Sequence, residues 1–424
     1  MLTEMVSAIG SSLTTFVLAY WAWKTFDRPG AIAEVTISFF LPMIITAPIA
    51  GILIDRLNRK AILIVSNLIL SGLLLLLAYL MYTDHLQFWH VYTTAIVHAC
   101  CTAFRTPTLQ ATMGLMVDRK QLTRITGLTQ SLNATAFICG PLIGGLLIGF
   151  LGGSGLLVLD AGSFLVSVIG ALLVAIPTPV RKPQAANKPN FLQEIAIGAR
   201  FLMQHKSMVA LVLSGTVFGI FGSFLVVLLL PMSSTVWTHL PEAAWMADLL
   251  GGGSNGSEQS FDAQVSGAMN TLLFFGVFTG GLLMASWGGF KNRVTNVMVG
   301  LLLAGLFQAL VATPNLYTAG FALFVCGLAG PMYNSTVQTI YLNKTPPEIQ
   351  GRVFSLLGLI GQITYPIGLV IVGLLGDHMK PADMLMYSGI GCVICCTLFL
   401  LFSSLRHVDR LVPNHEEAAG TTAG

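Results

Sequence analysis

The chain is built from apolar runs that are each long enough to cross a lipid bilayer. A helix needs about 20 largely apolar residues to span the hydrocarbon core. Because a lipid-exposed backbone must satisfy its own hydrogen bonds, and the period-two alternation of a barrel is absent, the runs are predicted to be helices. The sequence therefore predicts an all-α membrane protein with twelve transmembrane helices. The twelve runs are centred roughly on residues 14, 42, 72, 102, 137, 166, 219, 276, 304, 329, 364 and 394.

Composition supports this class and excludes several functions. Hydrophobic residues make up 54% of the chain and charged residues only 9%, which is beyond what a soluble core of this size needs. The net charge of +3 gives no reason to expect a nucleic-acid partner. All seven cysteines fall within predicted spans, where thiols pack like apolar groups, so we expect neither a disulfide nor a metal site. No phosphate-binding glycine loop is present, which argues against direct use of ATP, and no cofactor is expected.

Basic residues predict the sidedness of the helices. Of the 21 Lys and Arg residues, Arg105 falls inside a span, Lys24, Arg28 and Lys380 fall on one side, and the remaining 17 fall on the other. Lys and Arg in short loops prefer the cytoplasmic side. We therefore expect a multi-pass protein of the inner (plasma) membrane with both termini in the cytoplasm. The first span begins almost at Met1 without a cleavable signal pattern, so it is expected to remain as a helix.

A stretch rich in proline and basic residues divides the chain into two halves of six spans each. The halves look related, because Pro141 corresponds to Pro366 and Arg124 to Arg352 at similar offsets. The loop at 233–264, on the side opposite the basic loops, is rich in Gly and Ser, as flexible linkers are. The expected units are an N-terminal six-helix bundle (1–176), a cytoplasmic linker (177–206), a C-terminal six-helix bundle (207–405) and a cytoplasmic tail (406–424).

Two motifs carry the clearest functional signal. The first is a charged cluster between the second and third spans, made of Gly51, Asp55, Arg56, Arg59 and Lys60. The second lies in the fifth span and consists of Gly127, Ala136, Gly140, Pro141, Gly144 and Gly145. Small residues on one helix face let a neighbouring helix approach closely, and proline permits a bend. The alternative is that glycine and proline are simply common in membrane helices.

On these motifs the chain resembles the major facilitator superfamily of transporters. The charged cluster is similar to the loop between helices two and three of that family, with Asn58 where a Gly is usual. The second motif resembles the helix-five signature of exporters that work as antiporters, departing only in Ala136. Segments at Phe104 and Gly351 resemble the branch that contains macrolide and siderophore exporters. The resemblance implies two pseudo-repeated bundles that rock about a central cavity lined by helices one, four, seven and ten.

The charged cluster is predicted to form a gate. Asp55 is positioned to accept hydrogen bonds from the amides that open helix eleven, near Gly351, where the helix dipole favours an anion. The resemblance implies that Arg59 pairs with Asp118 at the end of helix four. The alternative is ordinary surface charge, because exposed ion pairs contribute only about 0–1 kcal/mol.

Charges inside the predicted spans indicate a coupling site, because a charge in hydrocarbon needs compensation. Arg105 and His98 lie on one polar face of helix four, and Glu4 lies at a similar depth to Arg105 on helix one. We predict that Glu4 and Arg105 face each other and couple proton flow to transport. Glu4 could instead be a helix-end charge at the interface, and His98 a satisfied core residue. For Asp160, in the sixth span, a structural hydrogen bond is favoured over a role in transport.

A cavity for amphipathic cargo should combine aromatic surface with a few hydrogen-bonding groups. The candidate wall residues are Phe16, Tyr20, Phe218, Phe221, Tyr333, Asn334 and Gln338. The sequence thus favours a proton-coupled secondary active exporter, an antiporter of small amphipathic molecules such as drugs or siderophores, that works by alternating access and confers multidrug resistance. Uptake, lipid flipping and, more remotely, a membrane-embedded enzyme are the alternatives. We expect a monomer whose partners are the bilayer, the cargo and protons.

Overall fold

The computed structural model describes residues 2–54, 57–116, 119–173, 191–243, 258–346, 349–376 and 378–402, and within these ranges all regular elements are helices. The helices are α1 (Leu2–Phe26), α2 (Pro29–Ile54), α3 (Arg59–Tyr82), α4 (Phe88–Met116), α5 (Arg119–Leu173), α6 (Phe191–Gln204), α7 (Lys206–Thr235), α9 (Glu258–Trp287), α10 (Arg293–Val311), α11 (Leu316–Lys344), α12 (Gln350–Gly376) and α13 (Pro381–Phe402), with the short 3-10 turns η1 (Trp237–His239) and η2 (Pro241–Ala243).

The helix α5 is 55 residues long because it contains two membrane-spanning helices. Gly152 interrupts it with φ 65° and ψ 176°, a backbone conformation that residues other than glycine rarely adopt. The chain therefore turns back at Gly152, and the two parts of α5 are the fifth and sixth spans. With α6 set aside as too short to cross a bilayer, the described ranges contain the twelve expected spans.

Hydropathy and length alone identify nine of these spans in the described ranges. The segments α1, α4 and the part of α5 before Gly140 fall outside that set. For α4 the reason is a run of polar residues that includes Thr94, His98, Thr102 and Arg105. Polar residues on membrane helices usually face the interior of the bundle, so these helices are where functional groups are expected.

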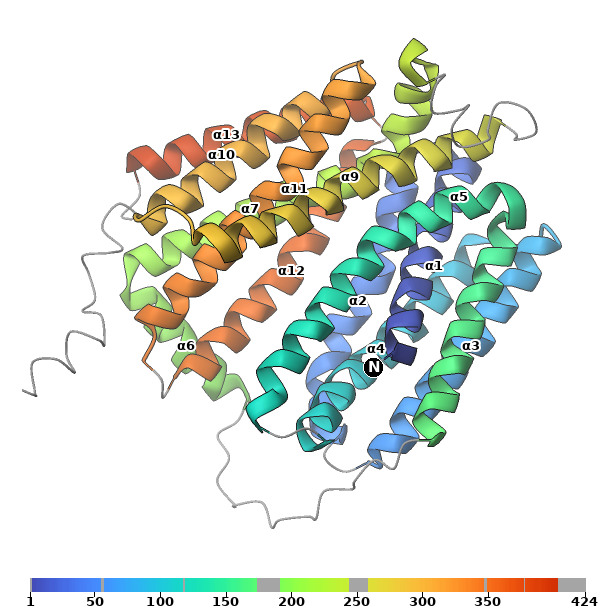
Figure 1. Cartoon of the computed structure of the whole chain (residues 1–424), viewed down its shortest axis with the longest axis horizontal. Coiled ribbons are helices and arrows are strands. Elements are labelled where there is room, and N and C mark those ends of the chain that lie inside the picture. The colour runs from blue at the N-terminus through green and yellow to red at the C-terminus, as the bar shows by residue number, and fades with distance from the viewer. Residues whose placement is uncertain are drawn as a thin grey trace, which may run out of the picture.

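The helices form two groups that follow the order of the chain. Figure 1 shows α1 to α5, in blue to green, on one side and α9 to α13, in yellow to red, on the other. Each group has its own apolar core, around Leu74, Leu157 and Phe164 in the N-terminal half and around Leu211, Leu301 and Cys396 in the C-terminal half. The expected boundaries of the two bundles remain predictions.

Part of the expected linker is a helix. The segment Phe191–Gln204 forms α6, which packs against the start of α12, where Gly198 lies close to the backbone of Arg352. Leu202 is 4% exposed, so one side of this amphipathic helix is buried in the C-terminal half. Its apolar spacing begins after the last proline of the linker, Pro189, which is why a reading based on prolines misses it.

The two ends of the bundle are called here the basic face and the opposite face. The basic face carries Lys60, Arg293, Lys344 and Arg352, and the opposite face carries Lys24, Arg28 and Lys380. Asparagines cap three of the helices at these faces. The side-chain oxygen of Asn58 accepts a hydrogen bond from the amide of Lys60 at 3.0 Å, and Asn292 and Asn315 cap α10 and α11 in the same way. The asparagine at position 58 therefore starts α3.

The two halves pack tightly against each other near the opposite face. Trp23, Ile32 and Ala33 from the N-terminal half share one apolar core with Leu228 and Trp237 from the C-terminal half. On the same side, α2 runs along α12, with the rings of Phe40 and Tyr365 5.1 Å apart. The structure is thus a conformation that is closed at the opposite face.

Candidate functional site

A cavity of about 480 Å³ lies in the C-terminal half, between α7, α11 and α12. Its walls come from the parts of these helices nearer the basic face, and Asn334 and Gln338 in the wall are solvent-exposed. Such a volume is within the usual range for small-molecule sites. Its position, together with the packed opposite face, means that the cavity is reached from the basic side.

The wall of the cavity is aromatic and polar but uncharged. The rings of Phe218 and Tyr333 stack 4.7 Å apart at an angle of 13°. The hydroxyl of Tyr333 hydrogen-bonds that of Ser214 at 2.9 Å, which fixes the ring. Asn334, Gln338, Thr216 and Thr364 supply hydrogen-bonding groups, and no lining residue described for this cavity carries a charge. The cavity therefore suits a ligand with an apolar body and a few neutral polar groups.

Four of the seven predicted wall residues line this cavity, namely Phe218, Tyr333, Asn334 and Gln338. The other three lie elsewhere. Phe16 is 8% exposed and packs beside Gly144 of α5, and Tyr20 lies under the ammonium group of Lys24, 5.9 Å from its ring centroid. Phe221 contacts the neighbourhood of Gly391 on α13. The N-terminal candidates therefore belong to packing near the opposite face.

Arg105 is held inside the N-terminal half by contacts from three helices. Its guanidinium donates to the hydroxyl of Ser7 on α1 at 3.2 Å and to the amide oxygen of Asn67 on α3 at 3.1 Å. It also lies 5.5 Å from the ring centroid of Phe164 on α5, a cation–π contact. The side chain of Glu4 is outside the described part of the structure, but Glu4 is three residues before Ser7 and on the same helix face. The pairing of Glu4 with Arg105 remains a prediction.

His98 sits among aromatic rings on the same side of α4. Its ring is 5.2 Å from that of Phe39 on α2 and 6.4 Å from that of Phe164 on α5, both edge-on. Its Nδ1 atom is 3.5 Å from the hydroxyl of Thr102. His98 and Arg105 thus share Phe164 as a neighbour, and a role of His98 in coupling remains a prediction.

The glycine-rich motif of α5 lies between the two halves. On one side, Gly140 and Gly144 face α1, where an added Cβ atom would overlap Ser12 or lie 2.8 Å from Phe16. On the other side, a Cβ atom on Gly145 would lie 2.6 Å from the carbonyl oxygen of Ala263 on α9. A Cβ atom on Gly267 of α9 would in turn lie 2.5 Å from the carbonyl oxygen of Pro141.

These contacts leave no room for larger residues on either side of the motif. Ala136, one turn earlier on α5, is 3% exposed. Gly127 lies in a part of α5 whose side-chain surroundings are outside the described set. The motif is therefore the surface on which α1 and α9 meet α5.

The predicted gate is described only in part. Asp55, Arg56 and Asp118 lie outside the described residues, and Gly51 lies in the last turn of α2. Lys60 donates to the backbone oxygen of Leu172 at the end of α5, at 2.9 Å, which ties the start of α3 to the sixth span. The contact of Asp55 with α12 and the pairing of Arg59 with Asp118 remain predictions.

Comparison with known proteins decides the family. The family model described as Major Facilitator Superfamily matches residues 1–368 and, in a second match, residues 224–423. The chain belongs to the Major Facilitator Superfamily. Members of this superfamily are transporters, so this multi-pass membrane protein is a transporter and not an enzyme.

Its relatives within the superfamily include efflux proteins. The chain is 26% identical to "Macrolide efflux protein A" of Streptococcus pyogenes over 96% of this chain and 95% of that protein. It is 29% identical to "Macrolide efflux protein A" of Enterococcus faecalis over 78% of this chain and 96% of that protein. Among solved structures, a bacterial homologue of the human lysosomal transporter Spinster, inward-facing and occupied, superposes with a TM-score of 0.67 at 16% identity, over 96% and 95% of the two chains. The last similarity concerns the fold alone.

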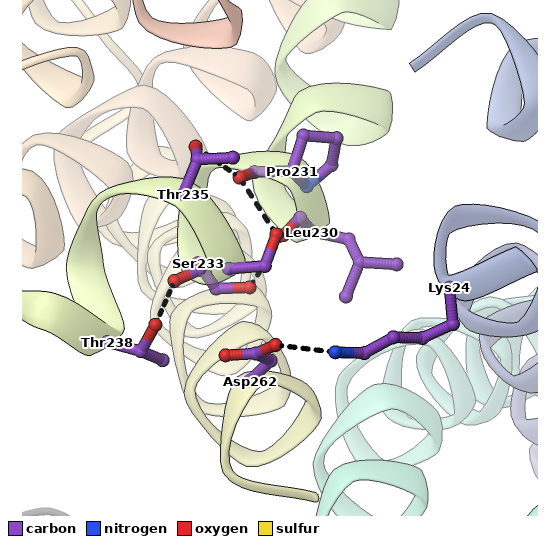
Figure 2. Close-up of polar contacts among 8 residues, drawn as sticks. Lys24, Leu230, Pro231, Ser233, Thr235, Thr238 and Asp262 are labelled. Atoms are coloured by element: carbon purple, nitrogen blue, oxygen red, sulfur yellow. Dashed lines mark hydrogen bonds and ion pairs between the residues drawn. The ribbon is translucent and has the colours of Figure 1, made fainter. Parts of the chain in front are cut away.

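One feature of this superfamily member was not predicted from its sequence. Near the opposite face, the ammonium group of Lys24 on α1 lies 2.9 Å from a carboxylate oxygen of Asp262 on α9. Figure 2 draws this contact as a dashed line. The two side chains are 29% and 11% exposed, so the pair is largely withdrawn from water. It joins the two halves directly beside the α5 motif. The sequence contains both charged residues in segments near the opposite face, but their pairing depends on how the two halves pack.

Breaking the Lys24–Asp262 pair is expected to favour opening at the opposite face. We expect Lys24→Met or Asp262→Asn to increase exposure of that face by roughly two- to fivefold, because such a pair contributes about 0.5–1 kcal/mol. The measurement is the rate at which an impermeant maleimide labels a thiol placed at Ala33, which is fully buried between the halves, in a cysteine-free background. The exchanged pair, Lys24→Asp with Asp262→Lys, should return the rate toward that of the parent. Equal rates in the single variants and the parent would show that the pair does not hold the face closed.

Proposed function

We propose that the protein is a proton-coupled exporter that moves small amphipathic molecules out of the cell by alternating access. The observation that carries this proposal is the uncharged cavity of α7, α11 and α12, reached from the basic side while the opposite face is packed shut. A cargo molecule would enter this cavity from the basic side. The halves would then rock about the glycine motif of α5 and expose it to the other side.

The orientation follows from the distribution of basic residues. With the basic face in the cytoplasm of a cell with an inner (plasma) membrane, both termini are cytoplasmic and the cavity loads from the cytoplasm. Export is favoured over uptake by the helix-five motif and by the relatives named as macrolide efflux proteins. Amphipathic drugs, macrolides among them, and siderophores are therefore the proposed cargo class.

Coupling to protons is assigned to the N-terminal half. Glu4 is the proposed carrier, and Arg105 the cation that stabilises its ionised form until a proton competes. The contact of Arg105 with Ser7, one turn from Glu4, supports this pairing, and His98 lies on the same polar face of α4. At the basic face, Asp55 and the Arg59–Asp118 pair would close the cytoplasmic side when the opposite face opens.

Everted membrane vesicles test both the direction of transport and its coupling to the proton gradient. With the vesicle interior acidified, a radiolabelled macrolide is expected to accumulate inside, and collapse of the pH gradient is expected to release it. Glu4→Gln should reduce accumulation at least ~tenfold, which corresponds to about 1.4 kcal/mol. Glu34→Gln is the matched control, since Glu34 pairs with Arg28 at 2.9 Å near the opposite face and has no proposed part in coupling.

The alternatives give different results in the same vesicles. Movement of the macrolide out of acid-loaded vesicles would indicate uptake in the cell. Accumulation that ignores the pH gradient would contradict proton coupling. Full activity of Glu4→Gln would remove Glu4 from the mechanism while leaving export in place.

A further inference from the structure

The carboxyl group of Asp160 is buried inside the N-terminal half. The residue is only 1% exposed. It lies roughly 12 Å along α5 from the turn at Gly152, taking 1.5 Å per residue. This depth is well within a hydrocarbon core about 30 Å thick. Asp160 therefore lies within the sixth span, where neighbouring side chains enclose its carboxyl group.

The partners of Asp160 are neutral. One carboxyl oxygen accepts a hydrogen bond from the hydroxyl of Thr14 on α1 at 2.5 Å, and the other accepts one from Ser163 at 2.9 Å. The ion pairs among the described residues, Lys24–Asp262 and Arg28–Glu34, do not include it. An ionised carboxylate in a low-dielectric interior is costly without a cation, and two hydroxyl donors compensate for only part of that cost.

One face of α1 contacts both Asp160 and Arg105. Ser7, Gly10 and Thr14 follow each other at spacings of three and four residues, so they lie on the same side of the helix. Ser7 accepts from Arg105, and Thr14 donates to Asp160. Gly10 between them leaves space for the carboxyl group, because a Cβ atom there would overlap a carboxyl oxygen of Asp160. A movement of α1 would therefore change the partners of the acid and of the cation together.

The charged and titratable groups around Asp160 come mainly from α4. Arg105 and His98 both lie against Phe164, one helical turn beyond Asp160 on α5. The neighbouring α3 contributes Asn67 to Arg105 and a hydroxyl, from Ser71, to the backbone of α5, and neither group titrates. The titratable residues of α1 are Glu4, Tyr20 and Lys24, and Lys24 is paired with Asp262 of α9, the helix that packs against α5 from the other half. Arg105 is thus close enough to Asp160 to interact with its carboxylate electrostatically.

We propose that Asp160 is a proton-binding site of the transport cycle. It holds a proton in the conformation described here, in which Thr14 and Gly10 enclose it. When α1 moves, the O–H bond of the acid breaks, the proton passes to water, and the remaining carboxylate is stabilised by Arg105. This inference rests on the proposed exporter function, and it adds a second proton site to the one at Glu4. The helix α1 also packs on the glycine motif of α5. Loss of the proton from Asp160, together with a movement of α1, would therefore change the packing at the surface where the two halves meet.

Infrared spectroscopy of the full-length protein in lipid tests the proton site directly. As the pH is raised through the neutral range, the wild-type protein is expected to lose a carbonyl band of a protonated carboxylic acid. Asp160→Asn should lack this band, whereas Glu34→Gln, the matched control at a carboxylate that is paired with Arg28, should keep it. Thr14→Val retains the acid but loses one of its donors, so it should move the pH at which the band disappears. Identical spectra for the wild-type protein and Asp160→Asn would overturn the proposal.

Transport measurements distinguish an acid that takes part in the transport cycle from an acid that only titrates. Asp160→Asn, reconstituted at the wild-type level, is expected to lose at least ~tenfold in macrolide accumulation driven by a pH gradient. If it folds poorly, Thr14→Val is expected to shift the pH profile of transport in the same direction as its infrared band. Wild-type transport rates in Asp160→Asn, or a Thr14→Val profile that does not follow the band, would overturn the proposal. Absence of gradient-driven transport in the wild-type protein would instead contradict the proposed function, and the infrared result would still decide whether Asp160 binds a proton.

Discussion

Transport is expected to fall at least ~tenfold in Gly267→Val, with the protein biased toward a state that is open at the opposite face. The added side chain would begin with a Cβ atom 2.5 Å from the carbonyl oxygen of Pro141, and this neighbour is backbone that cannot rotate away. Overpacking of this kind costs about 1–3 kcal/mol. The structure has this contact with the opposite face closed, and opening of that face is expected to separate α9 from α5, so the cost should fall on the closed conformation. A bias of roughly 5- to 150-fold between conformations follows.

Two measurements check this result. Macrolide accumulation in everted vesicles gives the loss of transport, and maleimide labelling of a thiol at Ala33 gives the exposure of the opposite face. Gly281→Val is the matched control, because Gly281 lies on the same helix and an added Cβ atom there meets nothing within 4 Å. Both variants make the same change in helix propensity, so only the contact with α5 differs. Normal transport with unchanged labelling in Gly267→Val would show that this contact opens or adapts without cost.

Asn334→Asp is expected to change the cargo preference of the transporter by about tenfold in favour of cations. Asn334 is exposed in the wall of a cavity whose described lining carries no charge. A carboxylate there attracts a cation at 4 Å by about 1 kcal/mol in bulk water and about 4 kcal/mol near a protein surface. A tenfold change corresponds to about 1.4 kcal/mol, which lies between these limits.

The experiment compares pairs of compounds that differ only in a quaternary ammonium group, each measured by its competition with macrolide transport. Asn270→Asp is the matched control, since it makes the same substitution on α9 of the same half, outside the wall of this cavity. A preference that changes equally in both variants would reflect the overall field of the protein. A preference that changes in neither would show that cargo does not bind beside Asn334.

Much of the fold is predictable from the sequence because membrane helices are long and uniform. The lengths of the apolar runs predict twelve spans. Two of these spans are the parts of α5 before and after the Gly-rich turn at Gly152. The amphipathic helix α6 is less evident, because it is short and follows a proline-rich stretch. Its burial depends on its contact with α12, where Gly198 lies against the backbone of Arg352, and a local sequence pattern does not contain this contact.

The candidate site is less predictable, because an apolar helix gives little information about which face it turns inward. Tyr333, Asn334 and Gln338 are polar enough to indicate one face of α11, and they line the cavity. Phe16 has no such neighbours to orient it, and it packs against Gly144. The Lys24–Asp262 pair joins residues 238 positions apart, so only the packing of the two halves brings them together.

The absence of charge from the described wall of the C-terminal cavity has a consequence for how such a pump evolves. Residues that choose the compound lie on α7, α11 and α12, whereas Arg105 and Asp160, the described ionisable groups proposed to serve energy conversion, lie on other helices in the other half. If the proposed function holds, substitutions in the wall can change which compounds bind, one residue at a time, while the groups proposed to bind protons stay as they are. A separation of this kind would let the range of cargo change without a change in the coupling to protons.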